Sequence, residues 1–229
     1  SWFSLLFRKW YKFMIPKIAK KANHILTVSE FSKNEIIKTL KIELHKISVI
    51  YNGLNSELLN YKCSGSKLKL DKKIILTVGS INPRKNIGPL IEGFVSLNNN
   101  DYQLVVVGGT SSNFKKETFK TKNDSVVFLG HIPDHELWEI YNEAELFVFP
   151  SLYEGFGIPI LEAAHFNCTI LANNLDLYKE LYPNFTINYT EGTKSAHYRD
   201  ALIALTKNSR IIENKKDVIP KAFSYIKSA

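Results

Sequence analysis

Residues 146–172 read LFVFPSLYEGFGIPILEAAHFNCTILA, and this segment gives the first indication of the fold. It opens with an apolar run, 146–149, passes through a glycine-rich segment, and closes with a second apolar run, 169–172. Between the two runs, Pro159 suits the first turn of a helix that extends to about Phe166. A strand, a helix and a second strand in this order indicate a β-α-β unit, whose strands pair in parallel.

The same alternation of short apolar runs and helix-like segments extends through the rest of the chain. The other expected strands are 25–28, 47–51, 74–78, 103–107, 126–129 and 185–188. Helix starts are expected at a capping box in 32–35, at Asn86 and at Asp134. Because the strands are apolar throughout, helices should cover both faces of the sheet. The sequence therefore predicts an α/β fold with a doubly wound, Rossmann-like parallel sheet.

The chain divides into three expected parts. Residues 1–53 read as the end of a preceding domain with its linker, because the strands before Asn52-Gly53 belong to a unit whose beginning is missing. Residues 54–219 form a self-contained α/β domain, and residues 220–229 form a truncated C-terminal helix.

Composition narrows the class of protein. Of the 229 residues, 45% are hydrophobic and 23% are charged, as in soluble globular proteins. The formal net charge of +8 indicates either a solvated basic surface or affinity for phosphates or an anionic membrane. No nucleic-acid recognition module is apparent, so no nucleic-acid partner is expected. Cys63 and Cys168 lack the spacing of a disulfide framework or metal cluster, which favours a reducing, cytoplasmic compartment.

The N-terminal residues 2–18 are apolar and aromatic, but five charged or Pro residues interrupt them. They are not expected to cross a membrane. They read as a basic, aromatic helix that either packs inside the protein or lies on the inner face of a membrane as a peripheral contact.

Four polar or glycine-rich segments each follow an expected strand. They are 79–86 (GSINPRKN), 108–110 (GGT), 130–133 (GHIP) and 150–157 (PSLYEGFG). Because doubly wound sheets bind ligands outside the carboxyl ends of their strands, these segments should share one rim that a long ligand can follow.

The last of these segments suits a sugar nucleotide. Gly155 and Gly157 let the backbone approach a ligand closely, and the helix that follows offers N–H groups to an anion. Glu162, about one turn into that helix, suits a ribose hydroxyl pair, and Glu154 can reach sugar hydroxyls. The alternative is a glycine turn carrying two exposed glutamates.

Arg84 and Lys85 suit a diphosphate. Arg offers a planar fork for phosphate oxygens, Lys offers a point charge, and fixed cations help most where charge develops during bond cleavage. The alternative is a solvated surface pair. The chain has no Asp-x-Asp motif of the kind that holds a metal-bound nucleotide sugar, so no metal and no cofactor are expected. The backbone of His131 or Ile132 is a candidate for contact with the base.

In order and over nearly the whole chain, these segments resemble the family-4 glycosyltransferases of the two-Rossmann-domain (GT-B) type. The matching segments are 27–32 (TVSEFS), 49–55 (VIYNGLN), 78–86 (VGSINPRKN), 106–109 (VVGG), 147–162 with its Glu-x7-Glu motif, and 223–225 (FSY). The 147–162 match is the most specific of them.

The resemblance implies that Glu154, Arg84 and Lys85 are catalytic, with Glu154 at the donor sugar and the two cations at the diphosphate. The remaining expected contacts to the nucleotide sugar are Glu162 (at the ribose), Gly79, Ser80, Gly108, His131, Ile132, Phe156, Gly157 and Ile158. It also implies sugar transfer with retained anomeric configuration and without a metal, to a glycan or lipid-linked acceptor in surface polysaccharide or lipopolysaccharide synthesis.

The sequence departs from the family pattern at three points. Ser80 stands where many members have Arg, most of the acceptor-binding domain has no counterpart, and the chain stops soon after Tyr225. We therefore expect this chain to bind the donor without transferring sugar by itself. Two other interpretations stay open: a nucleotide-sugar epimerase of the same fold, and a non-catalytic nucleotide-binding module.

Overall fold

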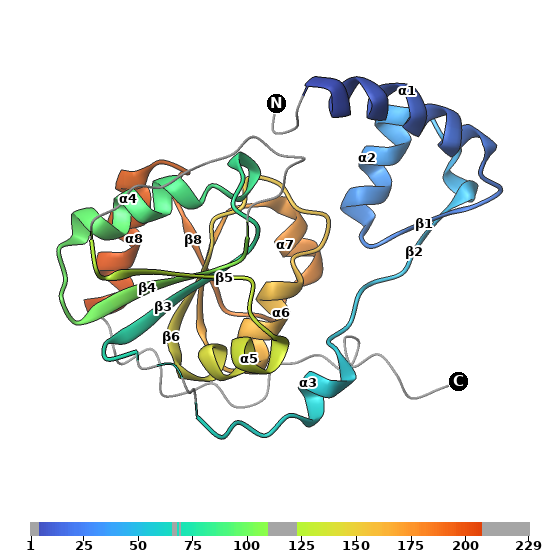
Figure 1. Ribbon diagram of the computed structural model, residues 1–229. Coiled ribbons are helices and arrows are strands. Elements are labelled where there is room, and N and C mark those ends of the chain that lie inside the picture. The colour runs from blue at the N-terminus through green and yellow to red at the C-terminus, as the bar shows by residue number, and fades with distance from the viewer. Residues whose placement is uncertain (1–4, 66–67, 69, 110–122, 208–229) are drawn as a thin grey trace.

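A computed structural model describes residues 5–65, 68, 70–109 and 123–207 of the protein (Figure 1). Its centre is a parallel six-stranded sheet with the order β5-β4-β3-β6-β7-β8. The strands are β3 (Lys73–Val78), β4 (Tyr102–Val107), β5 (Val126–Gly130), β6 (Ala144–Phe149), β7 (Thr169–Asn173) and β8 (Ile187–Thr190). This is the strand order of a Rossmann-like sheet, with its topological switch point between β3 and β6.

Helices cover both faces of this sheet, so the predicted doubly wound fold is confirmed (Figure 1). One face carries α4 (Ile87–Leu97) and α8 (Ser195–Lys207), and the other carries α5 (Asp134–Glu143), α6 (Ile158–His165) and α7 (Asp176–Leu181). Alternation along β3 illustrates the two layers. Ile74 and Leu76 belong to the core under α5, α6 and α7, whereas Ile75 belongs to the core under α4 and α8.

The N-terminal residues form a separate small unit (Figure 1). Its elements are α1 (Leu5–Lys21), β1 (Ile25–Thr27), α2 (Glu30–Leu40), the 3-10 turn η1 (Leu44–Lys46) and β2 (Ile47–Val49). The strands β1 and β2 pair in parallel over a small core. The helix α3 (Ser56–Asn60) then leads into the larger sheet. The expected helix over 220–229 and the FSY segment lie outside the described residues.

Helix α2 begins three residues earlier than the capping box at 32–35 predicts. Its N-cap is Ser29, whose side chain accepts a hydrogen bond from the Ser32 amide. A tertiary contact explains the earlier start. The Glu180 carboxylate, from α7, accepts hydrogen bonds of 2.8 Å from the amides of both Glu30 and Phe31. A distant carboxylate thus satisfies the first amides of the helix and lets it start earlier.

Two other expected caps act differently from the prediction. Pro133 is the N-cap of α5 and Asp134 is its first residue. Asn86 is the N-cap of α4, but its side chain donates to the Thr193 carbonyl and the Tyr198 hydroxyl and does not cap the helix. Strand β8 starts two residues later than expected. In the described part of the chain, no helix combines the length and apolarity needed to span a membrane.

Candidate functional site

The loops that follow β3 and β6 meet at the switch point of the sheet. The loop after β3 includes the 3-10 turn η2 (Pro83–Lys85), and the loop after β6, residues 150–157, is called here the Glu154 loop. A backbone hydrogen bond of 2.8 Å from the Leu152 amide to the Arg84 carbonyl joins the two loops directly. The fold therefore brings together two segments that lie almost seventy residues apart in the sequence.

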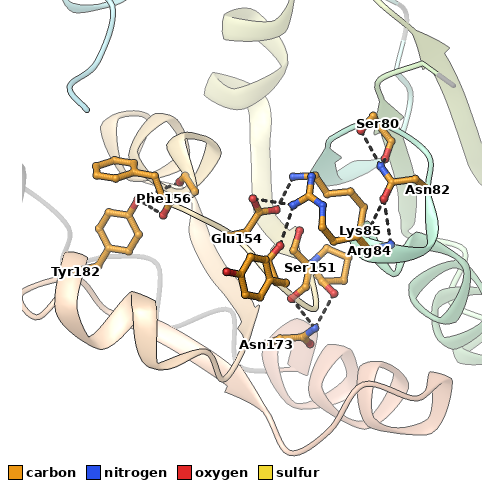
Figure 2. A network of polar contacts seen from close by, with 12 residues as sticks. Ser80, Asn82, Arg84, Lys85, Ser151, Glu154, Phe156, Asn173 and Tyr182 are labelled. Atoms are coloured by element: carbon orange, nitrogen blue, oxygen red, sulfur yellow. Dashed lines mark hydrogen bonds and ion pairs between the residues drawn. The ribbon is translucent and has the colours of Figure 1, made fainter. Parts of the chain in front are cut away.

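Glu154 forms ion pairs with both basic side chains of η2 (Figure 2). Its Oε2 is 3.0 Å from Arg84 Nη1, and its Oε1 is 2.6 Å from Lys85 Nζ. Arg84 Nη1 also donates to the Tyr153 carbonyl, and Lys85 Nζ lies 4.8 Å from the centre of the Phe149 ring. The three charged side chains are 11 to 22% exposed, so this is not a solvated surface pair.

Asn82 shapes the turn that presents these cations. It is fully buried, and its Oδ1 accepts hydrogen bonds from the amides of Arg84 and Lys85 at 3.0 and 3.3 Å. Its Nδ2 donates to the carbonyl and hydroxyl oxygens of Ser80 (Figure 2). Sequence reasoning missed this role, although Asn directly before Pro83 is a known signal for a helical turn.

Buried polar side chains also hold the Glu154 loop. Asn173, at the end of β7, donates to the carbonyls of Pro150 and Ser151 at 2.6 and 3.0 Å. The Tyr182 hydroxyl donates to the carbonyls of Phe156 and Gly157. Figure 2 shows both sets of contacts. Neither Asn173 nor Tyr182 was predicted, because each lies at least twenty residues after the backbone that it holds.

Close backbone approach explains two of the expected glycines. A Cβ on Gly108, whose φ is +134°, would lie 2.2 Å from the Gly79 carbonyl oxygen. Gly157, with φ +95°, is the N-cap of α6 and packs against the Tyr178 ring. These glycines let the strand ends and the start of α6 come together at the rim.

Glu162 lies in α6, where its Oε2 accepts a 3.0 Å hydrogen bond from the Tyr141 hydroxyl of α5. Burial raises the pKa of Glu162, and the hydrogen bond from Tyr141 opposes this rise by favouring the ionised form. The side chain remains partly exposed. A partly exposed carboxylate held by one donor keeps acceptor capacity for a ligand.

The other predicted residues take different positions. His131 is exposed, Ile132 packs against the larger core, and Ile158 is 39% exposed at the start of α6. The Phe156 ring is buried against Tyr182, which leaves only its backbone as a candidate contact. Within the described ranges, no three His, Cys, Asp or Glu side chains are grouped to hold a metal ion.

The N-terminal unit contacts the Glu154 loop through the first turn of α2 and its N-cap. Ser29 Oγ donates to the Gly155 carbonyl at 2.8 Å, and the Phe31 ring packs against the Tyr153 ring. With the contacts of Glu180 to α2, these interactions join the two parts of the molecule beside the site.

Two family models match the chain. Residues 64–222 match the model for glycosyl transferases group 1, and residues 1–58 match the model for glycosyltransferase family 4. The O-antigen chain mannosyltransferase RfbU of Salmonella typhimurium is 29% identical over 227 residues, which is 97% of this chain and 60% of that protein. The O-antigen chain mannosyltransferase B of Escherichia coli is 30% identical over 173 residues, covering 70% of this chain and 45% of the relative. The chain therefore spans 45 to 60% of the length of these relatives.

Solved structures share the fold. The sucrose-phosphate synthase of Thermosynechococcus elongatus has a TM-score of 0.68 at 20% identity, over 89% of this chain and 54% of that one. HepE of Anabaena, in complex with UDP-glucose, has a TM-score of 0.67 at 18% identity, over 85% of this chain and 57% of that one. The first family model matches more than half of the chain, in the domain that carries the Glu154 loop. The chain belongs to the glycosyl transferases group 1 family.

Proposed function

We propose that this chain is the donor-binding part of a glycosyltransferase that moves a sugar from a nucleotide diphosphate sugar to a glycan or lipid-linked acceptor. The observation that carries the proposal is the group of Arg84, Lys85 and Glu154 at the switch point of the sheet. Two cations and one carboxylate there suit a ligand with a diphosphate next to a polyol. The O-antigen mannosyltransferases among the relatives favour a role in surface polysaccharide synthesis.

In the proposed arrangement, Arg84 and Lys85 bind the diphosphate and Glu154 accepts hydrogen bonds from the donor sugar. Glu162 accepts from the ribose. The remaining contacts are backbone contacts of Gly79, Ser80, Gly108, Phe156, Gly157 and Ile158 near the phosphates and sugar, and of His131 and Ile132 near the base.

The proposed reaction retains the anomeric configuration. The bond between the anomeric carbon and the diphosphate oxygen breaks, and its electron pair leaves with the diphosphate. The acceptor oxygen forms the new bond on the same face, and its proton passes to the departing phosphate oxygen. Arg84 and Lys85 stabilise the negative charge that develops on that oxygen, which is the function a metal ion has in other transferases.

We also propose a cytoplasmic protein that contacts the inner face of a membrane through α1. In this helix, Leu6, Trp10 and Phe13 are more than half exposed and share a face with Lys17. Exposed aromatic residues among lysines suit the interface of an anionic bilayer. A membrane contact would bring the site close to a lipid-linked acceptor.

Nucleotide binding tests this function directly. Thermal unfolding of the chain is measured with UDP and GDP, each alone and as a hexose conjugate (UDP-glucose and GDP-mannose). Binding to the folded state should raise the midpoint by mass action for at least one base. EDTA should leave the shift unchanged, because Arg84 and Lys85 supply the positive charge. The function is wrong if no nucleotide changes the midpoint, and metal independence is wrong if EDTA removes the shift and Mg²⁺ restores it.

A further inference from the structure

Glu154 occupies the two cations that the proposed function assigns to the diphosphate. One carboxylate oxygen contacts Arg84 and the other contacts Lys85, so both oxygens are engaged (Figure 2). All three side chains are largely buried, which makes these interactions stronger than those of a surface ion pair. A ligand phosphate that approached Arg84 and Lys85 would meet an anion already in place.

The cations themselves need an anion. Burial lowers the pKa of Lys85, the neighbouring charge of Arg84 lowers it further, and the Glu154 carboxylate opposes both effects. Without a partner, two positive charges would lie together in a partly desolvated site, which is unfavourable. Either Glu154 or a ligand phosphate can satisfy this demand, and a second anion adds repulsion.

The backbone of the loop is fixed independently of this ion pair. Four backbone groups of this loop have hydrogen-bond partners other than the Glu154 side chain. They are the Leu152 amide and the carbonyls of Pro150, Ser151 and Gly155. The Glu154 side chain can therefore change rotamer without moving the loop.

We propose that Glu154 is an internal competitor of the diphosphate and thereby makes the site prefer the nucleotide sugar over the free nucleoside diphosphate. This proposal rests on the proposed function and assigns a specificity role to one of its residues. When a nucleotide sugar binds, the phosphates take Arg84 and Lys85, and the sugar hydroxyls donate hydrogen bonds to the displaced carboxylate. A free nucleoside diphosphate brings no such donors, so Glu154 loses its cations without compensation.

The same competition acts on the product. After the sugar has been transferred, the hydroxyl donors leave with it, and Glu154 returns to Arg84 and Lys85. Its return displaces the nucleoside diphosphate, whose release would otherwise be slowed by two buried cations.

The test compares Glu154→Gln with a matched control, Glu145→Gln. Glu145 forms a 3.0 Å ion pair with Lys73 near the amino ends of the strands, so its substitution removes the same charge at the opposite end of the sheet. Calorimetric titration uses inorganic pyrophosphate, which needs neither base nor sugar, and then UDP, GDP, UDP-glucose and GDP-mannose.

Glu154→Gln should bind pyrophosphate and the free nucleoside diphosphate about three- to tenfold more tightly than the wild type, because a neutral amide competes less strongly than the carboxylate for Arg84 and Lys85. The ratio of nucleotide-sugar affinity to free-nucleotide affinity should fall by at least the same factor. Glu145→Gln should change neither measurement by more than about twofold.

Two failures are distinguishable. If the wild type binds neither UDP nor GDP nor their conjugates, the proposed function is wrong. If the wild type binds one of them, but Glu154→Gln binds pyrophosphate and that nucleotide with equal or lower affinity, only the competition is wrong. An equal gain in Glu145→Gln would also overturn it, because the effect would then come from net charge alone.

Discussion

Tyr141 holds Glu162 through a hydrogen bond of 3.0 Å, so the ionisation of the expected ribose contact depends on a second residue. Burial raises the pKa of Glu162, and the Tyr141 hydroxyl lowers it again by donating to the ionised form. As the pH falls through this raised pKa, Glu162 gains a proton and loses acceptor capacity for the ribose. Nucleotide affinity should therefore fall at a higher pH than an ordinary Glu would give.

Tyr141→Phe removes that donor and should raise the pKa of Glu162 further. The loss of nucleotide affinity on acidification should then begin at higher pH, while the affinity well above the pKa changes less. The measurement is calorimetric titration with the best-bound nucleotide between about pH 5 and 8. Tyr102→Phe is the control, because Tyr102 donates to Glu145 near the amino ends of the strands. Superimposable pH curves for Tyr141→Phe and the wild type would contradict this role.

At the level of residues, the sequence indicated which chemical groups share a rim but not how they pair. The position of Arg84, Lys85 and Glu154 after strand ends follows from topology alone. The direct ion pairs among them depend on side-chain geometry that no spacing encodes. Asn82 and Tyr141 were missed for the same reason, since each acts through a contact between elements or within a turn.

At the level of elements, the close approach of the β3 and β4 ends depends on a residue without a side chain. The Gly108 amide donates to the Gly130 carbonyl, and a Cβ at Gly108 would lie 2.2 Å from the Gly79 carbonyl oxygen. The atom in the way belongs to the backbone, which cannot move aside as the end of a flexible side chain can. The φ of Gly108 is also +134°, a value that residues with a side chain rarely adopt. The two strand ends would have to separate.

Gly108→Ala should therefore lower the free energy of unfolding by more than about 3 kcal/mol, or prevent folding. Gly109→Ala is the matched control, since a Cβ there meets none of the described residues within 4 Å. Chemical denaturation of both variants, followed by circular dichroism, gives the comparison. Equal stability of the two variants would show that the strand ends can separate at little cost.

Element type was predicted better than element boundaries. All eight strands of the described residues were expected from their apolar runs. The signal is strongest for β4, β6 and β7, which are buried on both faces. The start of α2 was not predicted correctly, since the Glu180 carboxylate that extends this helix lies almost one hundred and fifty residues later in the sequence. Local capping patterns carry no information about such a partner.

At the scale of the whole molecule, positive charge is distributed unevenly. The formal net charge is +8, and α1 carries most of it, because that helix contains no Asp or Glu. Its basic residues are Arg8, Lys9, Lys12, Lys17, Lys20 and Lys21. The rest of the molecule is nearly neutral, so any long-range attraction to an anionic surface should orient the protein with α1 toward it.

Because of this asymmetry, an experiment can separate membrane binding by α1 from a general effect of the protein's net charge. Two triple variants lose the same charge: Lys9, Lys12 and Lys17 to Gln in α1, and Lys38, Lys62 and Lys194 to Gln elsewhere, all at exposed positions. In sedimentation with vesicles of phosphatidylglycerol and phosphatidylcholine in equal parts, the first variant should bind at least about tenfold more weakly, since each lysine near an anionic surface contributes about 1 kcal/mol.

The second variant should bind like the wild type, and all three proteins should bind pure phosphatidylcholine much more weakly than the wild type binds the anionic vesicles. Added salt should weaken wild-type binding, because the lysines act through screened charge. The exposed apolar and aromatic residues should add a contribution that salt does not remove, and Trp10→Ala should weaken it, since Trp10 is 54% exposed. Equal losses of binding in the two triple variants would show that net charge, and not α1, causes the attraction. Absence of wild-type binding to anionic vesicles would exclude the membrane contact of this helix.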